Sequence, residues 1–283
     1  MICNDNYYRH TVTVDSIIFT VRAMEKENYR RLPEKKLQVL LAKRGTEPYK
    51  DAWGLIGSVV RDEEGFTKAI ERSLKEKANI KNIYLEQLYS WGDPKRDPRE
   101  RVISTSYMGL IDSENIQLKA GRNIDEVKWF DVKIVPLKET KNEKNNGYQK
   151  TEDIDIILTS DNVILNSKVR VVKEFSKGNL SIYTQILKSD LAFDHAKILI
   201  YAIDRLKNKV EYTTIAFNLM PEKFTLTELQ QVYEILLDKP LLKANFRRKI
   251  YDMVIETEEF EGSSGHRPSK LFRFNTNWQP HVF

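Results

Sequence analysis

Apolar and polar positions alternate along the first 132 residues, except in one stretch with a helical period. Strand-like runs cover 11–21, 37–44, 82–92 and 101–111, and shorter strands are expected at 54–60 and 126–132. Between them, Phe66, Ile70 and Leu74 recur at helical spacing within residues 64–77. Strands on both sides of an amphipathic helix predict a mixed α/β first domain.

The pattern changes after Val132. Residues 137–153, LKETKNEKNNGYQKTED, are rich in Lys, Asn and Glu and predict a mobile surface loop. Residues 154–175 and 179–187 alternate again, with turn signals at 160–162 and 178–179, and predict a hairpin or small meander.

From Leu191 the period becomes helical. Helices are expected in 191–210, 225–239 and 241–256, and Thr225 with Glu228 has the form of a capping box. Residues 258–275 then alternate around a glycine-rich turn. Three helices followed by a β-hairpin are the plan of a winged helix-turn-helix. We therefore divide the chain into a first domain at 1–135, an excursion or linker at 136–190 and a winged helix at 191–283.

Composition narrows the class of protein. A chain of 283 residues, 41% hydrophobic and 31% charged, has the size of about two globular domains. The single cysteine excludes an internal disulfide, and no apolar run approaches the ~20 residues that span a bilayer. Without a secretion signal at the N-terminus, a cytoplasmic protein is expected. A net charge of +5 is compatible with a polyanionic partner.

The third C-terminal helix carries a basic face. Phe246, Ile250 and Val254 form its apolar stripe, which leaves the polar side chains free. Basic side chains neutralise phosphates, and Asn and Arg also read base edges in the major groove of duplex DNA, where the second helix of a helix-turn-helix enters. The candidates are Lys243, Asn245, Arg247, Arg248 and Lys249 on the helix, with His266, Arg267, Lys270 and Arg273 on the wing.

Residues 57–80, GSVVRDEEGFTKAIERSLKEKANI, have the spacing of a metal site. If Glu64 opens the helix, then Ser73, Glu76 and Lys77 share one face. Carboxylates there would bind Mg²⁺, which needs oxygen ligands and activates water against a pyrophosphate. Serine cannot replace a carboxylate, and Lys77 repels a cation. The hydrolytic activity of this site is therefore expected to be very low.

This stretch resembles the Nudix box. The box has the following pattern: glycine, five residues, Glu, seven residues, Arg-Glu, an aliphatic residue, any residue, Glu-Glu, any residue, glycine and an aliphatic residue. The arginine and the spacing are kept, whereas both glycines and two of the carboxylates are replaced. The corresponding residues are Ser58, Glu64, Arg72, Ser73, Leu74, Glu76, Lys77, Asn79 and Ile80. The flanking strands are similar to those of Nudix domains that handle ADP-ribose.

Residues 191–250 and the wing at 265–274 are similar to the C-terminal domain of the NrtR family of Nudix-related transcriptional regulators. The resemblance implies an α+β fold, with a Nudix-like α/β/α sandwich around a mixed sheet before the winged helix. It also implies a homodimer that binds a duplex DNA operator of NAD-biosynthesis or sugar-utilisation genes and responds to ADP-ribose or a related nucleotide or sugar phosphate. The excursion at 133–190 is longer than the family leads us to expect.

On this interpretation the effector lies against the sheet without a required cofactor. Arginine forks match phosphate geometry, and Trp53 or Trp91 is available to stack on an adenine. The expected phosphate-binding residues are Arg44, Arg72, Lys77, Arg99 and Arg101. His195 is expected to be structural.

Other interpretations stay open. Without the resemblance, both charged helices would be ordinary amphipathic helices with solvated faces. An active, Mg²⁺-dependent ADP-ribose pyrophosphatase would need Glu63, Glu64, Glu76 and another carboxylate to assemble a rearranged metal site. A non-catalytic protein whose C-terminal domain binds RNA or another protein, and a transcription factor without a ligand, are the remaining alternatives.

Overall fold

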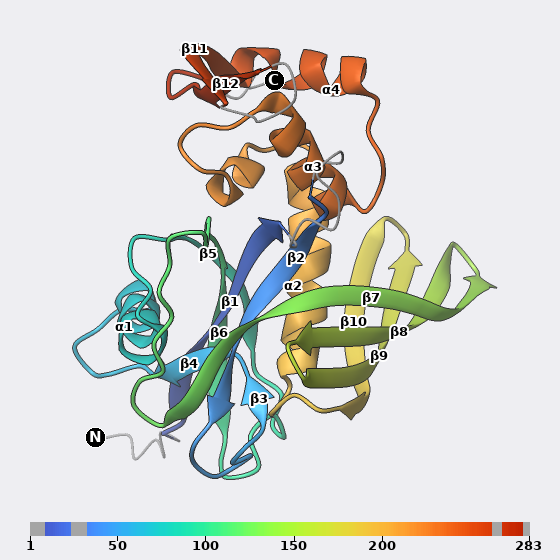
Figure 1. Cartoon of the computed structure of the whole chain (residues 1–283). Coiled ribbons are helices and arrows are strands. Elements are labelled where there is room, and N and C mark those ends of the chain that lie inside the picture. The colour runs from blue at the N-terminus through green and yellow to red at the C-terminus, as the bar shows by residue number, and fades with distance from the viewer. Residues whose placement is uncertain (1–8, 24–32, 262–267, 280–283) are drawn as a thin grey trace, which may run out of the picture. The chain divides into compact units, whose positions relative to one another are not determined.

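The computed structural model describes residues 9–23, 33–261 and 268–279 (Figure 1). The first elements are β1 (Thr11–Ala23), β2 (Lys35–Arg44), β3 (Trp53–Gly54), β4 (Ile56–Val59), α1 (Phe66–Ala78), β5 (Tyr84–Trp91) and β6 (Val102–Leu110). The strands β7 (Ile124–Lys144), β8 (Gly147–Ser160), β9 (Val163–Ser176) and β10 (Asn179–Ser189) follow. The C-terminal elements are α2 (His195–Val210), η1 (Ile215–Leu219), α3 (Leu226–Leu237), α4 (Lys243–Ile250), η2 (Tyr251–Met253), β11 (Val254–Glu261) and β12 (Ser269–Phe274).

The chain divides into two compact units. The first comprises Met1–Ile17, Val39–Gly109 and Gln117–Ile200, and the second Ile18–Gln38, Leu110–Ile116 and Tyr201–Phe283. The domain boundaries proposed from the sequence stay predictions. Among the described residues, no helix is long and apolar enough to cross a membrane.

One ten-stranded sheet contains β1 to β10. Its order is β10-β9-β8-β7-β2-β1-β6-β5, with β3 paired to β2 and β4 paired to β1. The predicted strands at 11–21 and 37–44 are therefore neighbours. The predicted strand at 126–132 is the beginning of β7, which Figure 1 shows as one long ribbon leading to its hairpin with β8.

The loop expected at 137–153 is wrong. Residues 124–144 and 147–160 form an antiparallel pair whose register runs from Asp131↔Thr159 to Lys144↔Gly147. Oppositely charged side chains of neighbouring strands pair across this sheet, as in the ion pair between Lys150 and Glu139 at 3.1 Å. Such cross-strand pairs stabilise a sheet whose polar composition by itself resembles a loop. The meander predicted from 154–187 is confirmed in β8, β9 and β10.

The helix of the Nudix-like stretch is shorter than predicted. It begins at Phe66 after the N-cap Gly65, so Glu64 precedes the helix instead of opening it. Ile70 and Leu74 are fully buried as predicted, but Phe66 is 40% exposed because it occupies the first turn.

The second unit contains the winged helix. The capping box is present: Thr225 Oγ1 accepts from Glu228 N at 3.2 Å, and Glu228 Oε2 accepts from Thr225 N at 2.9 Å. The third helix ends at Ile250, so Val254 does not extend its apolar stripe but begins strand β11. β11 and β12 form the predicted hairpin, and Phe224 adds a further bridge to Phe272. The predicted turn at 262–265 lies outside the described residues.

Candidate functional site

Arg72 of α1 forms hydrogen bonds with several residues of the segment that precedes the helix. Its Nε donates to Glu64 Oε2 at 2.8 Å, and its Nη2 donates to the other oxygen of the same carboxylate. Nη2 also contacts Val59 O at 3.1 Å and Ser58 Oγ at 3.3 Å, while Nη1 reaches Glu76 Oε2 at 3.5 Å. The hydrogen bonds from Arg72 lower the pKa of Glu64 to about 2, so this carboxylate is ionised at neutral pH.

The positions that would hold a metal are occupied by unsuitable groups. Lys77 Nζ donates to the carbonyl oxygen of Gly57, and both oxygens of Glu64 are engaged by Arg72. Ser73 is fully buried, and its Oγ has no hydrogen-bond partner among the described residues. Mg²⁺ needs several oxygen ligands with negative charge. This donor set does not fit Mg²⁺.

Arginines hold two of the glutamates named for a rearranged metal site. Glu63, Glu64 and Glu76 are all described, yet no three acidic, histidine or cysteine side chains of the described residues form a group suited to a metal. Glu64 is held by Arg72, and Glu76 lies near Arg72 and Arg61, whose Nη2 is 3.8 Å from Glu76 Oε1. In the described part of the chain these three glutamates do not come together as metal ligands, and an active pyrophosphatase stays an untested alternative.

Four of the predicted phosphate-binding cations, Arg44, Arg72, Lys77 and Arg99, lie close enough for their charges to act on one another and form what is called the cation cluster below. Burial lowers the pKa of Arg44 first, and the charge of Arg99 lowers it further. Burial also lowers the pKa of Lys77, and the charge of Arg44 is the next cause. Arg72 adds to the same effect on Lys77. An anion placed among these cations would relieve their mutual repulsion, so their arrangement suits a phosphate.

The predicted phosphate-binding arginines are held in different ways. Arg44 Nε donates to Pro48 O at 2.9 Å, and its guanidinium lies 4.8 Å from the centre of the Phe193 ring. Arg99 donates from Nε and Nη2 to the two oxygens of Asp97, at 3.0 and 2.7 Å, yet its side chain is 58% exposed. Arg101 has a buried Nη1 without a hydrogen-bond partner among the described residues.

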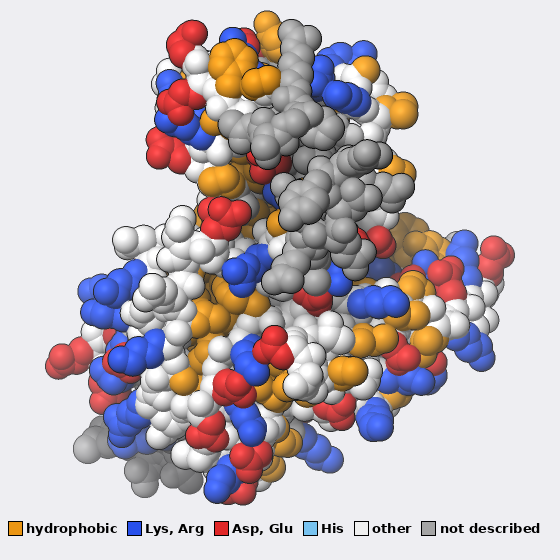
Figure 2. All heavy atoms as spheres, in the orientation of Figure 1, with side chains coloured by type: hydrophobic (Ala, Val, Ile, Leu, Met, Phe, Trp, Pro, Cys, Tyr) orange, Lys and Arg blue, Asp and Glu red, His pale blue; other side chains and the backbone are white. Residues whose placement is uncertain are grey.

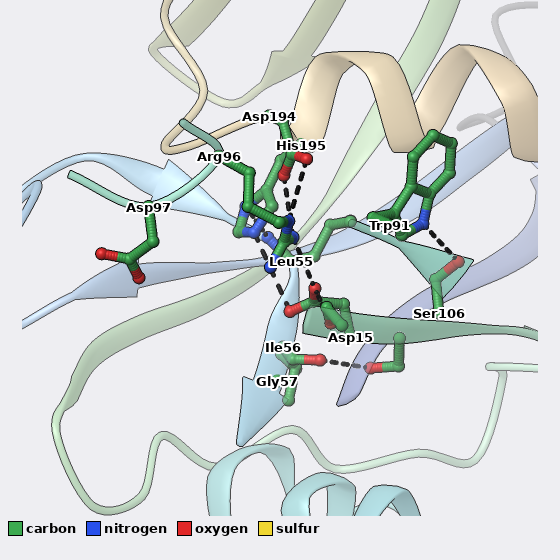
Figure 3. Close-up of polar contacts among 12 residues, drawn as sticks. Asp15, Leu55, Ile56, Gly57, Trp91, Arg96, Asp97, Ser106, Asp194 and His195 are labelled. Carbon is green, nitrogen blue, oxygen red and sulfur yellow. Dashed lines mark hydrogen bonds and ion pairs between the residues drawn. The ribbon is translucent and has the colours of Figure 1, made fainter. Parts of the chain in front are cut away.

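Neither tryptophan presents a stacking surface. Trp53 is 5% exposed and packs edge-on against Phe130, with ring centres 4.8 Å apart. Trp91 is also 5% exposed, and its Nε1 donates to Ser106 Oγ at 2.9 Å (Figure 3). The expectation that Trp53 stacks on an adenine disagrees with this burial, because strand β3 directs the ring into the core.

A buried ionic network beside the cluster was missed from the sequence (Figure 3). Arg96 donates to Asp194 through Nε at 3.1 Å and Nη2 at 2.9 Å, and to Asp15 Oδ2 through Nη2 at 3.2 Å. Ser104 Oγ donates to the same oxygen of Asp15 at 2.6 Å. Because the partners of Arg96 are 81 and 98 residues away in sequence, no local pattern reveals the network.

His195 begins α2 next to this network. It is 4% exposed, and its Nδ1 accepts from the backbone N–H of Leu55 at 3.0 Å. Burial lowers the pKa of His195, so the ring is neutral near pH 7. The expectation of a structural histidine is therefore confirmed.

The basic helix of the second unit presents most of its predicted contacts to solvent. Lys243, Asn245, Arg247 and Arg248 are exposed, while Phe246 and Ile250 are buried. Arg248 Nη2 donates to Asn245 Oδ1 at 3.2 Å, which holds these two side chains together.

Two other predicted DNA contacts are engaged within the protein. Lys249 Nζ donates to Glu211 O at 2.9 Å and lies 5.3 Å from the centre of the Tyr233 ring, and burial lowers its pKa. Lys270 pairs with Glu256 across the hairpin. Lys249 is exposed like the other basic residues of α4, and its role in DNA contact stays a prediction. His266 and Arg267 lie outside the described residues.

Figure 2 shows no single basic patch on the face in view, since Lys and Arg side chains alternate with Asp and Glu. On this face, mixed charge favours recognition of an anion by local groups over attraction by the net charge.

Comparison with known proteins supports the assignment of a Nudix domain in the first half of the chain and a winged helix in the second. A family model of the NUDIX domain matches residues 31–150, and one of the NrtR DNA-binding winged helix domain matches residues 216–274. The ADPR responsive transcriptional repressor NtrR of Acinetobacter baylyi is 30% identical over 272 residues, covering 95% of this chain and 84% of that protein.

Two further relatives cover different lengths. The ADP-ribose pyrophosphatase of Methanocaldococcus jannaschii is 32% identical over 130 residues, which are 46% of this chain and 67% of that enzyme. The crystal structure of Shewanella oneidensis NrtR complexed with a 27mer DNA has a TM-score of 0.61 and 25% identity, and the match covers 93% of each chain. A Nudix fold followed by a winged helix defines a two-domain DNA-binding regulator. This chain belongs to the NrtR family of Nudix-related transcriptional regulators.

Proposed function

We propose that the protein is a DNA-binding transcriptional regulator whose Nudix domain binds ADP-ribose or a related nucleotide or sugar phosphate without hydrolysing it. One observation carries the proposal: the Lys77 ammonium donates to the Gly57 carbonyl at a position where a metal site needs a carboxylate. A fixed positive charge there opposes a metal ion but attracts the phosphate that the metal would otherwise bridge. No cofactor is then required.

Arg44 and Lys77 are the inner phosphate-binding residues in this proposal, and the exposed Arg99 is the outer one. Arg101, with its unpartnered buried Nη1, supplies a further donor to a ligand oxygen. Arg72 acts indirectly, because its guanidinium is already engaged by Glu64 and the backbone before α1. The ligands expected from this donor set carry at least two phosphate or sugar oxygens.

The cation cluster is connected to the first turn of α2. Arg44 lies over the ring of Phe193, and that ring is 5.3 Å from the ring of His195 at the start of the helix. Phe193 has a φ of 52°, in the left-handed region that costs a non-glycine residue free energy. A ligand that draws Arg44 away from Phe193 changes the balance of contacts there. Coupling of this kind is typically about 1–3 kcal/mol.

The DNA-binding half of the proposal rests on the exposed Lys243, Asn245, Arg247 and Arg248 of α4. A homodimer in the cytoplasm would read a two-fold operator, with half-sites one helical turn or a multiple apart. NAD-biosynthesis and sugar-utilisation genes are the proposed targets, and ligand binding is proposed to weaken the complex with DNA.

Isothermal titration of the full chain with ADP-ribose, with and without Mg²⁺, tests the sensor. The same samples are assayed for AMP. Saturable binding without AMP release supports the proposal, and Arg44→Met should weaken that binding at least tenfold. Arg61→Met is the matched control, because Arg61 lies near Glu76. Mg²⁺-dependent release of AMP would favour the alternative of an active pyrophosphatase.

The regulator itself is tested with duplex DNA selected from a random pool by the purified protein. Fluorescence anisotropy then measures the affinity for the selected duplex with and without ADP-ribose. Mutual weakening of the two ligands is expected, because coupling between sites is reciprocal. Independent binding of DNA and ADP-ribose would contradict the sensor, and failure to enrich any duplex would favour an RNA or protein partner.

A further inference from the structure

Leu242 stands at the N-cap of α4, and it is 74% exposed. The helical period predicts the opposite, because Leu242 precedes Phe246 by four residues and Ile250 by eight, and both of these are buried. The backbone at Leu242 is extended, with φ −69° and ψ 121°, so its side chain leaves the buried stripe just before the helix begins. A large apolar side chain is therefore presented to solvent at the start of the basic helix.

The chain that leads to Leu242 is held by side chains of α3. Gln230 Nε2 donates to Leu241 O at 2.9 Å, and Glu234 Oε1 accepts from Leu241 N at 2.8 Å. Gln230 Nε2 also donates to Glu234 Oε1 at 3.0 Å. Both backbone polar groups of Leu241 are thus bound, which limits the freedom of the next residue. The exposure of Leu242 is therefore a property of a well-held turn, in which a contact residue is already in place before a ligand binds.

Local preference gives no reason for leucine at this position. The N-cap favours Ser, Thr, Asp and Asn, whose side-chain oxygen accepts a hydrogen bond from the first turn. Thr225 follows this rule at α3, whereas Leu242 makes no side-chain capping hydrogen bond at α4. Leu242 thus neither caps its helix nor fills the core. Residues that break local rules without a structural gain are expected where a function needs them.

The neighbours of Leu242 define the chemistry of its ligand. Residues three apart on a helix are neighbours, so Leu242 lies in line with Asn245 and Arg248, which are exposed and joined by a hydrogen bond at 3.2 Å. Lys243 and Arg247 are exposed beside them. A fitting ligand combines anionic groups, polar edges and one apolar group. The major groove of duplex DNA offers all three, and its apolar group is the C5-methyl of thymine.

We propose that Leu242 contacts the C5-methyl group of a thymine in each half-site of the operator, beside the base edges that face Asn245. This contact rests on the proposed function, since it requires α4 to enter the major groove, where N-terminal residues of a recognition helix contact base edges. It also selects DNA over RNA, because uracil lacks the methyl group and the major groove of an RNA helix is too narrow for side chains to read. Burial of one methyl group should raise the affinity about fourfold.

Deoxyuridine substitution tests the contact in the duplex that the wild type selects from the random pool. Each symmetric pair of thymines is replaced in turn, which keeps the base pairs and removes only the methyl groups. Fluorescence anisotropy should show that one pair of replacements weakens binding of the wild type about 16-fold, or about fourfold per methyl group. Leu242→Asn should bind the original duplex more weakly but respond little to the same replacement. This variant should fold, because Asn is a favoured N-cap residue.

Tyr251→Asn is the matched control. Tyr251 is 77% exposed at the opposite end of α4, so this variant should keep the wild-type response to deoxyuridine. A wild type that binds duplex but tolerates every deoxyuridine would overturn the contact and leave the proposed function standing. An equal response in Leu242→Asn and the wild type would do the same. A wild type that enriches no duplex would overturn the contact and the proposed function together.

Discussion

Arg72 and Glu64 form a two-pronged ion pair across eight residues, with Nε 2.8 Å from Oε2 and Nη2 bound to the other oxygen. In a metal-dependent site a carboxylate at this position would face a cation. Here the arginine of the same helix occupies both oxygens, so the pair braces the segment that precedes α1. The arginine and glutamate kept from the Nudix box thus stabilise the local structure, and this role does not depend on catalysis.

Replacing Arg72 by Met should raise the pKa of Glu64 from about 2 toward the ordinary value of 4.5. Since the folded-state pKa lies below the unfolded value, the pair stabilises the fold above pH 4.5 and ceases to do so as the pH falls toward 2. Titration of the Glu64 carboxyl by carbon NMR measures the pKa. Arg61→Met should change it far less, and equal shifts in both variants would contradict the assignment.

Ser73→Ala should stabilise the protein. The buried Ser73 Oγ has no partner among the described residues, and an unsatisfied buried hydroxyl costs about 1–3 kcal/mol. Urea unfolding should show a gain of about 1 kcal/mol. Ser104→Ala is the matched control: its hydroxyl donates to Asp15 at 2.6 Å, so its removal should destabilise. A loss of stability in Ser73→Ala would mean that the hydroxyl has a partner.

Arg96→Met should be the most damaging substitution near the site. It leaves the carboxylates of Asp15 and Asp194 buried without their cation, and breaking a buried ion pair in this way costs about 3–5 kcal/mol. Denaturant unfolding at pH 7 gives the free energy. Lys95→Met, at the exposed neighbouring position, should stay within about 0.5 kcal/mol of the wild type. Similar values for both variants would show that Arg96 is not buried with its partners.

Stability should fall as the pH drops below 6.5, because His195 is buried and its folded-state pKa lies below that ordinary value. The unfolded chain then binds one more proton, and the slope for a single such group is about 1.4 kcal/mol per pH unit. Asp15 and Asp194 favour the protonated ring, whereas Arg96 and Arg44 oppose it. Thermal unfolding from pH 7.5 to 5.0 should show this slope.

The matched variant for that titration is His195→Asn, whose amide oxygen can accept the hydrogen bond from Leu55 N without titrating. Its stability should depend less on pH in the same window. Identical pH profiles for variant and wild type would rule out His195 as the group responsible.

Arg247→Ala should weaken binding to the selected duplex and reduce the dependence on salt, expressed as the slope of log K against log[salt], by about 1. Lys249→Met should leave that slope nearly unchanged, because its ammonium contacts Glu211 O and the Tyr233 ring. Fluorescence anisotropy at several KCl concentrations measures both. Equal losses of slope would show that Lys249 turns outward to DNA.

The sequence by itself determined the order of elements where the periodicity was strong. Ile70 and Leu74 identified the face of α1, Thr225 and Glu228 identified the start of α3, and the spacing from Ser58 to Lys77 identified a hydrolytic frame without its ligands. These signals are local, since each depends on residues within one helix or its flanking turn.

Only the tertiary structure decided the features that depend on distant partners. Residues 137–153 look like a loop until Glu139 of one strand meets Lys150 of the next. Trp53 is available for stacking in sequence but is buried against Phe130 in space. In the sequence Arg96 is one of several charged residues in a turn, whereas in the structure it forms buried ion pairs with Asp15 and Asp194. Burial and charge pairing between residues far apart in the chain are set by packing, which no local pattern records.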